Sequence, residues 1–216
     1  DYRVKVIGKE KWFDKSNIHD LDQIIPGICG SGIFEVMVEL ANAGLIDQSG
    51  LFKPEIAPDK FIKKGNVWTY ILIEQADKPI VIQQTDIRAV QLAKAALYAG
   101  VQLLAESLKC ETFDEILLAG AFGTHLDSKY VSEIGIIPNA PSNIISSIGN
   151  AAGMGAAMAL LNIDERKNII KAVKQIDKIE AATEQKFQDY FINAMKFPTA
   201  PLAIKSNKRN RRRKTQ

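Results

Sequence analysis

The sequence predicts a mixed α/β domain, and two glycine-rich segments are its most informative features. The apolar run Ile116 to Ala119 stops at a turn in which Gly120 and Gly123 flank Ala121 and Phe122. Further along the chain, residues 149–157 are mostly Gly and Ala. Short apolar runs mix with segments of helical spacing but do not alternate with them strictly. This mixture favours a mixed α/β fold over a doubly wound one.

The two glycine-rich segments also indicate a binding site. Glycine has no Cβ, so the backbone at these positions can approach a ligand or a second helix closely. A strand-ending turn alone explains the first segment equally well, and close helix packing explains the second. The presence of both in one chain indicates a nucleotide cleft rather than a simple packed core.

The composition excludes several classes of protein. The 216 residues are 46% hydrophobic and 25% charged, as in ordinary globular proteins. No apolar run approaches the roughly 18 residues that span a bilayer, and the start of the chain has no secretory pattern. The two cysteines, Cys29 and Cys110, form no CxxC pair, so a zinc or iron–sulfur site within this chain is not expected. We expect a cytoplasmic protein whose own residues hold no metal.

The net charge of +3 hides an uneven distribution. Seven basic residues between Lys205 and Lys214 contribute +7, which leaves −4 for the rest of the chain. A body that binds nucleic acid through general positive charge is therefore not supported. The basic end is predicted to be a disordered tail, and it lacks the interleaved aromatic residues of a base-stacking surface.

Strands are predicted where short apolar or alternating runs end at turn residues. Pro26-Gly27 is the clearest turn signal in the first part of the chain, and residues 75–79 join two of the strands. The predicted strands are residues 3–7, 68–73, 80–83 and the buried strand 116–119.

Helices are predicted where apolar residues recur three and four apart between capping residues. Gly44 stands where the first helix would end. Thr85 or Asp86 is expected to cap the longest helix, which runs to about Ser107. The predicted helices span about 30–43, 85–107, 127–133, 150–161, 164–177 and 181–195.

One candidate anion site lies at the start of the first helix. Unpaired N–H groups there, flanked by Gly30 and Gly32 around Ser31, suit a negatively charged ligand. The spacing matches neither a Walker A loop nor the GxGxxG fingerprint, and a tight loop-to-helix junction explains it equally well. Cys29 is either a thiolate stabilised by the helix start or a buried, inert thiol.

A second candidate is Lys94 on the longest helix, where it falls between Ile87 and Val101 inside the apolar stripe. Gln91 and Tyr98 flank it. A lysine in this position either extends its ammonium to water or meets an acceptor. Spacing alone favours the first alternative. The second would be a phosphate, a ribose or a carboxylate in a cleft.

At the level of motifs, the chain resembles the C-terminal domain of the reductive activators of corrinoid proteins. The resemblance covers about Pro26 to Pro198 and rests on five motifs in the same order. They are Gly27-Ile28-Cys29-Gly30-Ser31-Gly32, Thr85-Asp86-Ile87-Arg88 with Gln91 to Ala96, Leu118-Ala119-Gly120-Ala121-Phe122-Gly123, Gly135-Ile136-Ile137-Pro138 and Gly149-Asn150-Ala151-Ala152-Gly153.

This resemblance implies the C-terminal portion of a ribonuclease H-like, actin-like ATPase fold, that of the acetate and sugar kinase, heat-shock chaperone and actin superfamily. It also implies that ATP drives one electron from an iron–sulfur domain to the inactive cob(II)amide of a corrinoid protein, which gives cob(I)amide for methyl transfer. It implies no catalytic residue. The implied nucleotide-binding residues are Gly30, Ser31, Gly32, Gln91, Lys94, Gly120, Ala121, Phe122, Gly123, Asn150 and Gly153.

The chain also departs from the family pattern. The family has an iron–sulfur module and two phosphate-binding Asp-Gly-Thr turns, and nothing upstream of Gly27 resembles the turns. The chain, which begins with Asp1 rather than Met, is therefore predicted to be a C-terminal fragment with half a nucleotide cleft and little ATPase activity alone. We expect residues 1–25 to be a remnant of an upstream domain, 26–203 the ATPase-fold domain and 204–216 the disordered tail.

By the same resemblance, ATP with Mg²⁺ is the expected ligand, and a 2Fe–2S or 4Fe–4S cluster is expected only in the missing part. The expected partner is a corrinoid iron–sulfur protein or the corrinoid subunit of a methyltransferase. A homodimer is left open, and neither membrane nor nucleic acid is expected. Two other functions are also left open: a kinase-like phosphotransferase, whose catalytic Asp we do not identify, and a non-catalytic nucleotide- or partner-binding module.

Overall fold

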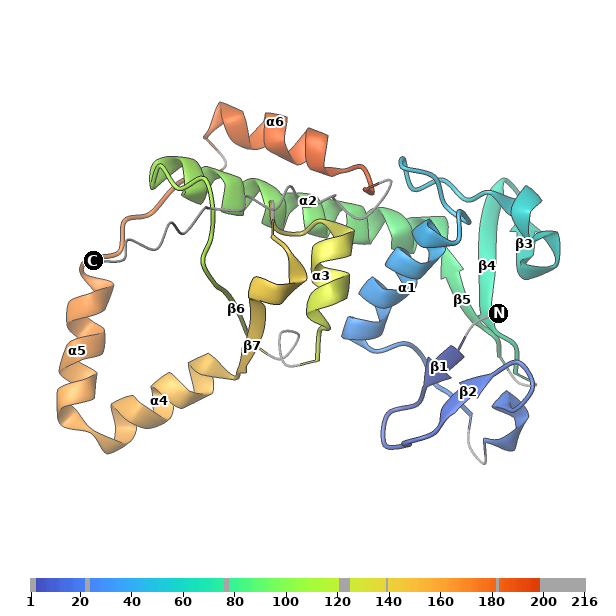
Figure 1. The fold of residues 1–216 in the computed structure, drawn as a ribbon, viewed down its shortest axis with the longest axis horizontal. Coiled ribbons are helices and arrows are strands. Elements are labelled where there is room, and N and C mark those ends of the chain that lie inside the picture. The colour runs from blue at the N-terminus through green and yellow to red at the C-terminus, as the bar shows by residue number, and fades with distance from the viewer. Residues whose placement is uncertain are drawn as a thin grey trace, which may run out of the picture.

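A computed structural model shows a mixed α/β protein, which confirms the predicted fold class (Figure 1). The longest helix, α2 (Gln84–Ser107), runs through the middle of the molecule, and α6 (Gln185–Ala194) packs along it. An antiparallel sheet lies at one end of the molecule and the helices α4 and α5 at the other. The structure describes residues 3–21, 24–75, 78–120, 125–138, 140–181 and 183–198.

The N-terminal part forms a small antiparallel hairpin. Strand β1 (Arg3–Lys5) pairs with β2 (Trp12–Asp14), and a short 3-10 helix, η1 (Ile18–Asp20), follows. The strand predicted over 3–7 is therefore real but shorter. Phe13 and Ile18 are buried, which joins the hairpin to the main core. The predicted division after residue 25 stays a prediction.

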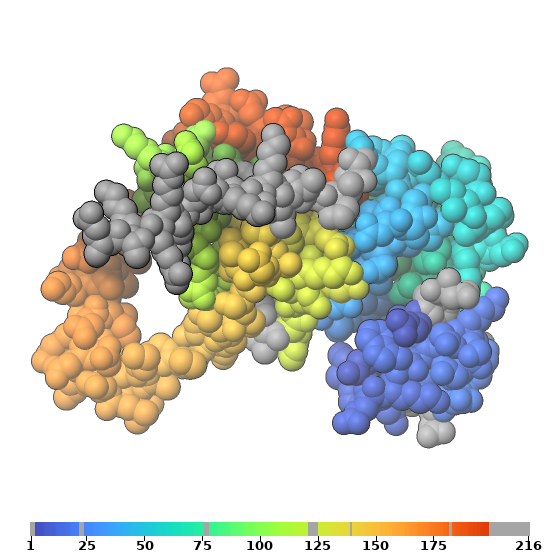
Figure 2. All heavy atoms as spheres, in the orientation of Figure 1, coloured from blue at the N-terminus to red at the C-terminus, as the bar shows by residue number. Residues whose placement is uncertain are grey.

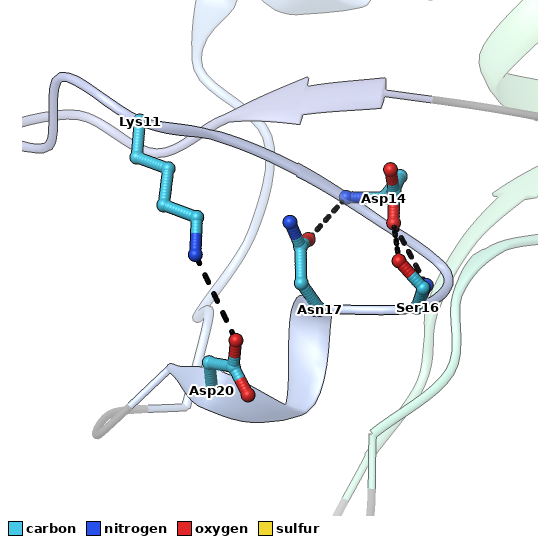
Figure 3. Close-up of polar contacts among 5 residues, drawn as sticks. All are labelled: Lys11, Asp14, Ser16, Asn17 and Asp20. Carbon is cyan, nitrogen blue, oxygen red and sulfur yellow. Dashed lines mark hydrogen bonds and ion pairs between the residues drawn. The ribbon is translucent and has the colours of Figure 1, made fainter.

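Local hydrogen bonds hold the chain after β2 (Figure 3). The carboxylate of Asp14 accepts from the N–H of Ser16 at 2.8 Å and from its hydroxyl at 2.5 Å, and these bonds lower the pKa of Asp14. The N–H of Asp14 donates to Oδ1 of Asn17 at 2.7 Å, and Lys11 lies 3.7 Å from Asp20. Polar residues in this segment thus specify a turn rather than a longer strand.

Helix α1 (Gly30–Asn42) confirms the first predicted helix. It buries Met37, Val38 and Leu40 against the core. The helix ends as the sequence predicts, because Gly44 adopts a φ of +71°, a left-handed conformation that glycine adopts without steric cost.

The antiparallel sheet has the order β3–β4–β5, with strands β3 (Phe61–Lys64), β4 (Val67–Ile73) and β5 (Ile80–Gln83). The sequence predicts β4 and β5 but not β3, which follows the short helices η2 (Pro54–Ile56) and η3 (Pro58–Lys60). Only Phe61 of β3 is buried, because β3 is an edge strand whose other residues face water. Its ring packs edge-on against Phe52 and Tyr70, both at 5.2 Å.

The long helix α2 begins one or two residues before the predicted caps. Gln83 is the N-cap, and the carboxylate of Asp86 reaches back to accept from the N–H of Gln83 at 2.7 Å. Neither Thr85 nor Asp86 is therefore the cap itself. Asp86 occupies the third helical position of a capping box instead. Helix α6 begins at Gln185 rather than 181, because Ala181 and Thr183 form turns.

Strands β6 (Ile116–Ala119) and β7 (Ile145–Gly149) form a parallel pair, and among the described strands each pairs only with the other. Strand β6 is predicted, but its expected burial is wrong: Leu117 is 50% exposed, because nothing in the described chain covers that side. Strand β7 is not predicted, since its centre is Ser146-Ser147. Helix α3 (Ser128–Ile134) and η4 (Ser142–Ile144) lie between the two strands in sequence.

Helices α4 (Ala151–Leu161) and α5 (Ile163–Val173) confirm the predicted Gly/Ala helix and its successor. They pack against each other and project away from the rest of the molecule (Figures 1 and 2). None of the helices in the described part of the chain has the length and apolarity needed to cross a bilayer. The predicted tail, residues 204–216, lies outside the described residues.

Candidate nucleotide-binding site

The parallel strands bring two of the predicted motifs to one edge of the sheet. Gly120 follows β6 and Gly149 ends β7, and the N–H of Gly120 donates to the carbonyl of Gly149 at 2.8 Å. Both glycines have positive φ angles, +104° and +68°. The chain therefore turns away sharply after each strand, at the carboxyl ends where parallel sheets commonly bind ligands.

Asn150 begins helix α4 immediately after β7. Its Oδ1 accepts from the N–H of Gly153 at 2.9 Å, which satisfies one of the free donors at the helix start. A Cβ on Gly153 would lie only 2.5 Å from Nδ2 of Asn150, so any other residue there would displace the capping amide. Asn150 and Gly153 thus form one structural unit beside Gly120, with an eleven-residue helix that directs its positive end toward the same edge.

Ala121, Phe122 and Gly123 lie outside the described residues. Their neighbour Gly120 is described, and a Cβ placed on it would meet nothing within 4 Å. Among the described residues nothing therefore occupies that side of the backbone, as a site that admits a ligand close to the main chain requires.

At the start of α1, Cys29 is the N-cap, and its Sγ accepts from the N–H of Gly32 at 3.3 Å. The hydroxyl of Ser31 lies 3.3 Å from the same sulfur. A Cβ on Gly32 would approach Ile28 Cγ2 to 3.0 Å, so glycine fits this turn best. The Cys29 residue is exposed, which excludes the alternative of a buried thiol.

Helices α1 and α3 lie against each other. Asp127, the N-cap of α3, and Glu39 both raise the pKa of Glu35, after the larger effect of burial. The Tyr130 hydroxyl donates to Glu39 at 2.9 Å, and burial together with this bond raises the pKa of Tyr130 to about 12. Glu35 and Glu39 of α1 therefore form one polar group with Asp127 and Tyr130.

Sequence reasoning assigned no role to Glu35, Glu39 or Tyr130. A signal was present, since Glu35 and Glu39 are four residues apart and so lie on one face of the helix. The partner across the interface, Tyr130 of α3, is 91 residues from Glu39 in sequence, and no local pattern identifies such a contact.

Gln91 and Lys94 have another environment. Their side chains are 1% and 2% exposed. The ammonium of Lys94 donates to the carbonyl of Ala194 at 2.6 Å, and Nε2 of Gln91 donates to that of Met195 at 2.9 Å. The ammonium of Lys94 therefore bonds an acceptor within the protein. The spacing had favoured the other alternative, an ammonium that extends to water. The acceptors are backbone carbonyls at the end of α6, and a nucleotide contact for either residue stays a prediction.

The described residues do not form a metal centre: no group of three or more His, Cys, Asp or Glu among them is arranged to hold an ion. The site is instead made of backbone groups. A glycine follows or ends each of the two parallel strands, and α4 starts at their edge. This arrangement defines the class of α/β proteins that bind nucleotides through the main chain.

Comparison with known proteins gives the family. The chain belongs to the family described as the C-terminal domain of RACo, the ASKHA domain, whose model matches residues 1–208. ASKHA folds are nucleotide-binding folds, which agrees with the class that the geometry defines.

Two known proteins are similar to this chain. The corrinoid activation enzyme RamQ from Eubacterium limosum is 38% identical over 184 residues, which cover 78% of this chain and 31% of RamQ. A solved structure, the reductive activator for corrinoid, iron–sulfur protein, has a TM-score of 0.73 at 29% identity and covers 80% of this chain and 28% of that one. The chain therefore spans about a third of the length of these relatives.

Proposed function

We propose that this chain is the nucleotide-binding part of an ATP-dependent reductive activator that returns the cob(II)amide of a corrinoid protein to cob(I)amide. The observation that carries the proposal is the hydrogen-bonded junction of Gly120 and Gly149, which holds two glycine turns and the start of α4 at one sheet edge. The two similar proteins, both named as corrinoid activators, supply the reaction.

Backbone groups would bind the nucleotide. Gly120, with the following Ala121, Phe122 and Gly123, would contact the adenosine, and the start of α4 at Asn150 would direct its free N–H groups toward the same ligand. Gly30, Ser31 and Gly32 would add a second helix start. Gln91 and Lys94 would position the end of α6, whose carbonyls they bond, and their own contact with the nucleotide stays a prediction.

The electron would come from elsewhere. The sequence has only two cysteines, too few for the four thiolates that commonly hold a 2Fe–2S or 4Fe–4S cluster. The cluster would therefore be carried by the part of the protein that this chain does not contain. That cluster, once reduced, would supply the one electron that converts Co(II) to Co(I), and ATP with Mg²⁺ would make this uphill step favourable. The whole protein would act in the cytoplasm on a corrinoid protein.

The reaction is tested with the polypeptide encoded by the complete reading frame. The corrinoid protein in its cob(II)amide state is mixed with this polypeptide and a low-potential reductant, and the cob(I)amide absorption band is followed with and without ATP. We expect the band to form only with ATP. Equal rates without ATP would contradict the proposal.

A pair of matched variants tests the site. Asn150→Ala and Asn162→Ala each remove a helix N-cap, of α4 and α5 respectively, with a similar stability cost of about 1 kcal/mol. Only Asn150 lies at the strand edge. We expect Asn150→Ala to weaken the binding of a fluorescent ATP analogue severalfold and Asn162→Ala to leave it unchanged. Equal effects of the two changes would remove Asn150 from the site.

The coding region upstream of Asp1 supplies an independent test. We expect it to encode two Asp-Gly-Thr turns and a four-cysteine cluster motif. We also expect the 216-residue chain alone to show weak or no ATPase activity, since it would hold only the adenosine side of the cleft. Robust hydrolysis by the purified chain would contradict this division of the site.

A further inference from the structure

The last described residues of the chain, 194–198, form a segment that we call the strap. Three consecutive carbonyls of the strap accept hydrogen bonds from two buried side chains of α2, Gln91 and Lys94, at 2.6 to 2.9 Å. The N–H of Phe197 then donates to the carbonyl of Gln48 at 2.9 Å. The strap is therefore bound both to α2 and to the loop that follows α1.

The two side chains of α2 set the register of the strap. Both are costly to bury, because burial lowers the pKa of Lys94 to about 8 and Oε1 of Gln91 accepts no hydrogen bond from any described residue. Apolar side chains of similar shape would fill the same interface without these costs, but they would let the strap slide along α2. Bonds to three consecutive carbonyls allow one register only. The polar contact thus specifies where Phe197 and Pro198 lie.

Phe197 and Pro198 lie against the carboxyl-terminal ends of both α1 and α3. Phe197 is 3% exposed, and a Cβ on Gly135, the C-cap of α3, would lie 3.3 Å from Cγ of Pro198. Gly135 begins the motif at 135–138, to which the proposed nucleotide contacts give no role. Phe197 and Pro198 also line one small cavity with residues near the ends of the two helices, which are Val38, Ala41, Asn42, Glu133 and Ile134.

Helices α1 and α3 run parallel, so the strap contacts the end of the pair that is opposite to the start of α1 (Figure 1). Residue numbers rise together along the contact, which pairs Glu35 with Asp127, Glu39 with Tyr130 and Asn42 with Glu133. Helix α1 has 13 residues, which corresponds to a length of about 20 Å. A tilt of about 5° around its carboxyl-terminal end would therefore move Gly30 by about 2 Å. Binding sites generally need their groups held within about 0.5 Å.

We propose that the strap is a positioning device for the nucleotide site. Phe197 and Pro198, held in register by α2, fix the tilt of α1 against α3 and with it the position of the helix start at Gly30. This role of the strap rests on the proposed function, in which the start of α1 contacts the nucleotide. Gln91 and Lys94 then act on the nucleotide site through the strap.

The test compares three variants of the polypeptide encoded by the complete reading frame. Phe197→Leu and Pro198→Ala reduce the side chains that contact α1 and α3 and leave the α2 anchor intact. Phe61→Leu is the matched control, because Phe61 is also buried, at 8% exposure, but belongs to β3 of the antiparallel sheet. The affinity for a fluorescent ATP analogue is measured by titration, and amide hydrogen exchange in α1 and α3 is measured without nucleotide. Pro198 is only partly buried, so Pro198→Ala keeps the test decisive if Phe197→Leu fails to fold.

We expect Phe197→Leu and Pro198→Ala to weaken binding of the ATP analogue about fivefold or more and to speed exchange at the ends of α1 and α3. Phe61→Leu should change neither by more than about twofold. Equal weakening by Phe197→Leu and Phe61→Leu would overturn the proposal, because the strap would then act through overall stability alone.

Failure of the proposed function would give a different result. The wild-type polypeptide would bind no ATP analogue, while Phe197→Leu would still speed exchange in α1 and α3 and so support the hold of the strap on these helices. Unchanged exchange in both helices would overturn the positioning role of the strap, whatever the binding measurement gives.

Discussion

Lys94 of α2 donates a hydrogen bond to the carbonyl of Lys196, a residue 102 positions later, at 2.8 Å. The same ammonium bonds the carbonyl of Ala194 at 2.6 Å, and Gln91, one turn earlier, bonds that of Met195. Two polar side chains inside an apolar helix face thus hold three consecutive carbonyls at the end of α6. The adjacent Phe197 is 3% exposed, so this contact also fixes a core aromatic.

The first prediction concerns this anchor. Lys94→Met keeps the length and apolarity of the stem but leaves the carbonyls of Ala194 and Lys196 buried without their donor. We expect a loss of about 2–3 kcal/mol in the free energy of unfolding at pH 7, measured by urea denaturation. Arg88→Met, an exposed position on the same helix, should change it by less than about 0.5 kcal/mol. Equal values for the two variants would show that the anchor contributes little.

The second prediction is a pH dependence. Burial lowers the pKa of Lys94 to about 8, whereas an unfolded lysine has a pKa of about 10.4. Between these values the unfolded chain holds a proton that the folded chain has released, so the free energy of unfolding rises with pH. A neutral amine keeps two N–H donors, enough for both carbonyls.

Urea denaturation from pH 7.5 to 9.5 measures this rise in the free energy of unfolding. A single group can contribute at most about 1.4 kcal/mol per pH unit. Higher pH is avoided because the pKa of Tyr130 is raised to about 12, and ionisation of this tyrosine in the unfolded chain would then lower stability. Lys94→Met should remove the rise. A wild-type stability that falls over this range would contradict the assignment.

The third prediction concerns the loop before η2, where Gly50 packs on Gln91. Gly50 has a φ of +78°, and a Cβ there would lie 2.8 Å from the amide atoms of Gln91. Gly65 has a φ of +60° but nothing within 4 Å. Alanine in the left-handed conformation at either position destabilises the folded chain by about 1–2 kcal/mol. Only Gly50→Ala also displaces Gln91 from its carbonyl partners.

Thermal unfolding distinguishes these two variants. We expect Gly50→Ala to lower the melting temperature clearly more than Gly65→Ala, by an amount that corresponds to at least about 1 kcal/mol. Equal melting temperatures for the two variants would mean that the amide of Gln91 can move without loss of stability. Its contact with Met195 would then not contribute to the anchor.

Local signals predicted most of the elements of this fold. Gly44 ends α1 and Asn150 begins α4 as the sequence indicates, because helix ends depend on residues close in sequence. Strands β2, β3 and β7 were missed because they depend on pairing. The lysines of β3 and the serines of β7 carry no strand pattern of their own.

The site was predictable to a similar extent. Small residues identified the segments of Gly120 and Gly153, but only the β6–β7 pairing shows that both segments begin at the same edge of the sheet. The apolar stripe on α2 correctly indicated that Lys94 is unusual, yet its acceptors lie on α6, 100 residues or more away, beyond the reach of any local pattern. The exposure of α4 was also unpredictable, since an apolar helix is normally expected inside a core.

The last prediction compares two glycines on α4. A Cβ at Gly155 meets nothing within 4 Å, so Gly155→Ala should stabilise the helix by up to about 1 kcal/mol through its higher helix propensity. A Cβ at Gly153 meets Nδ2 of Asn150 at 2.5 Å and displaces the cap, which offsets that gain. The two variants should therefore differ by about 1 kcal/mol in the free energy of unfolding measured by urea denaturation.

Because the displaced Asn150 side chain lies at the strand edge, Gly153→Ala should also weaken the binding of an ATP analogue, and Gly155→Ala should not. Equal binding by both variants would place the nucleotide away from the start of α4.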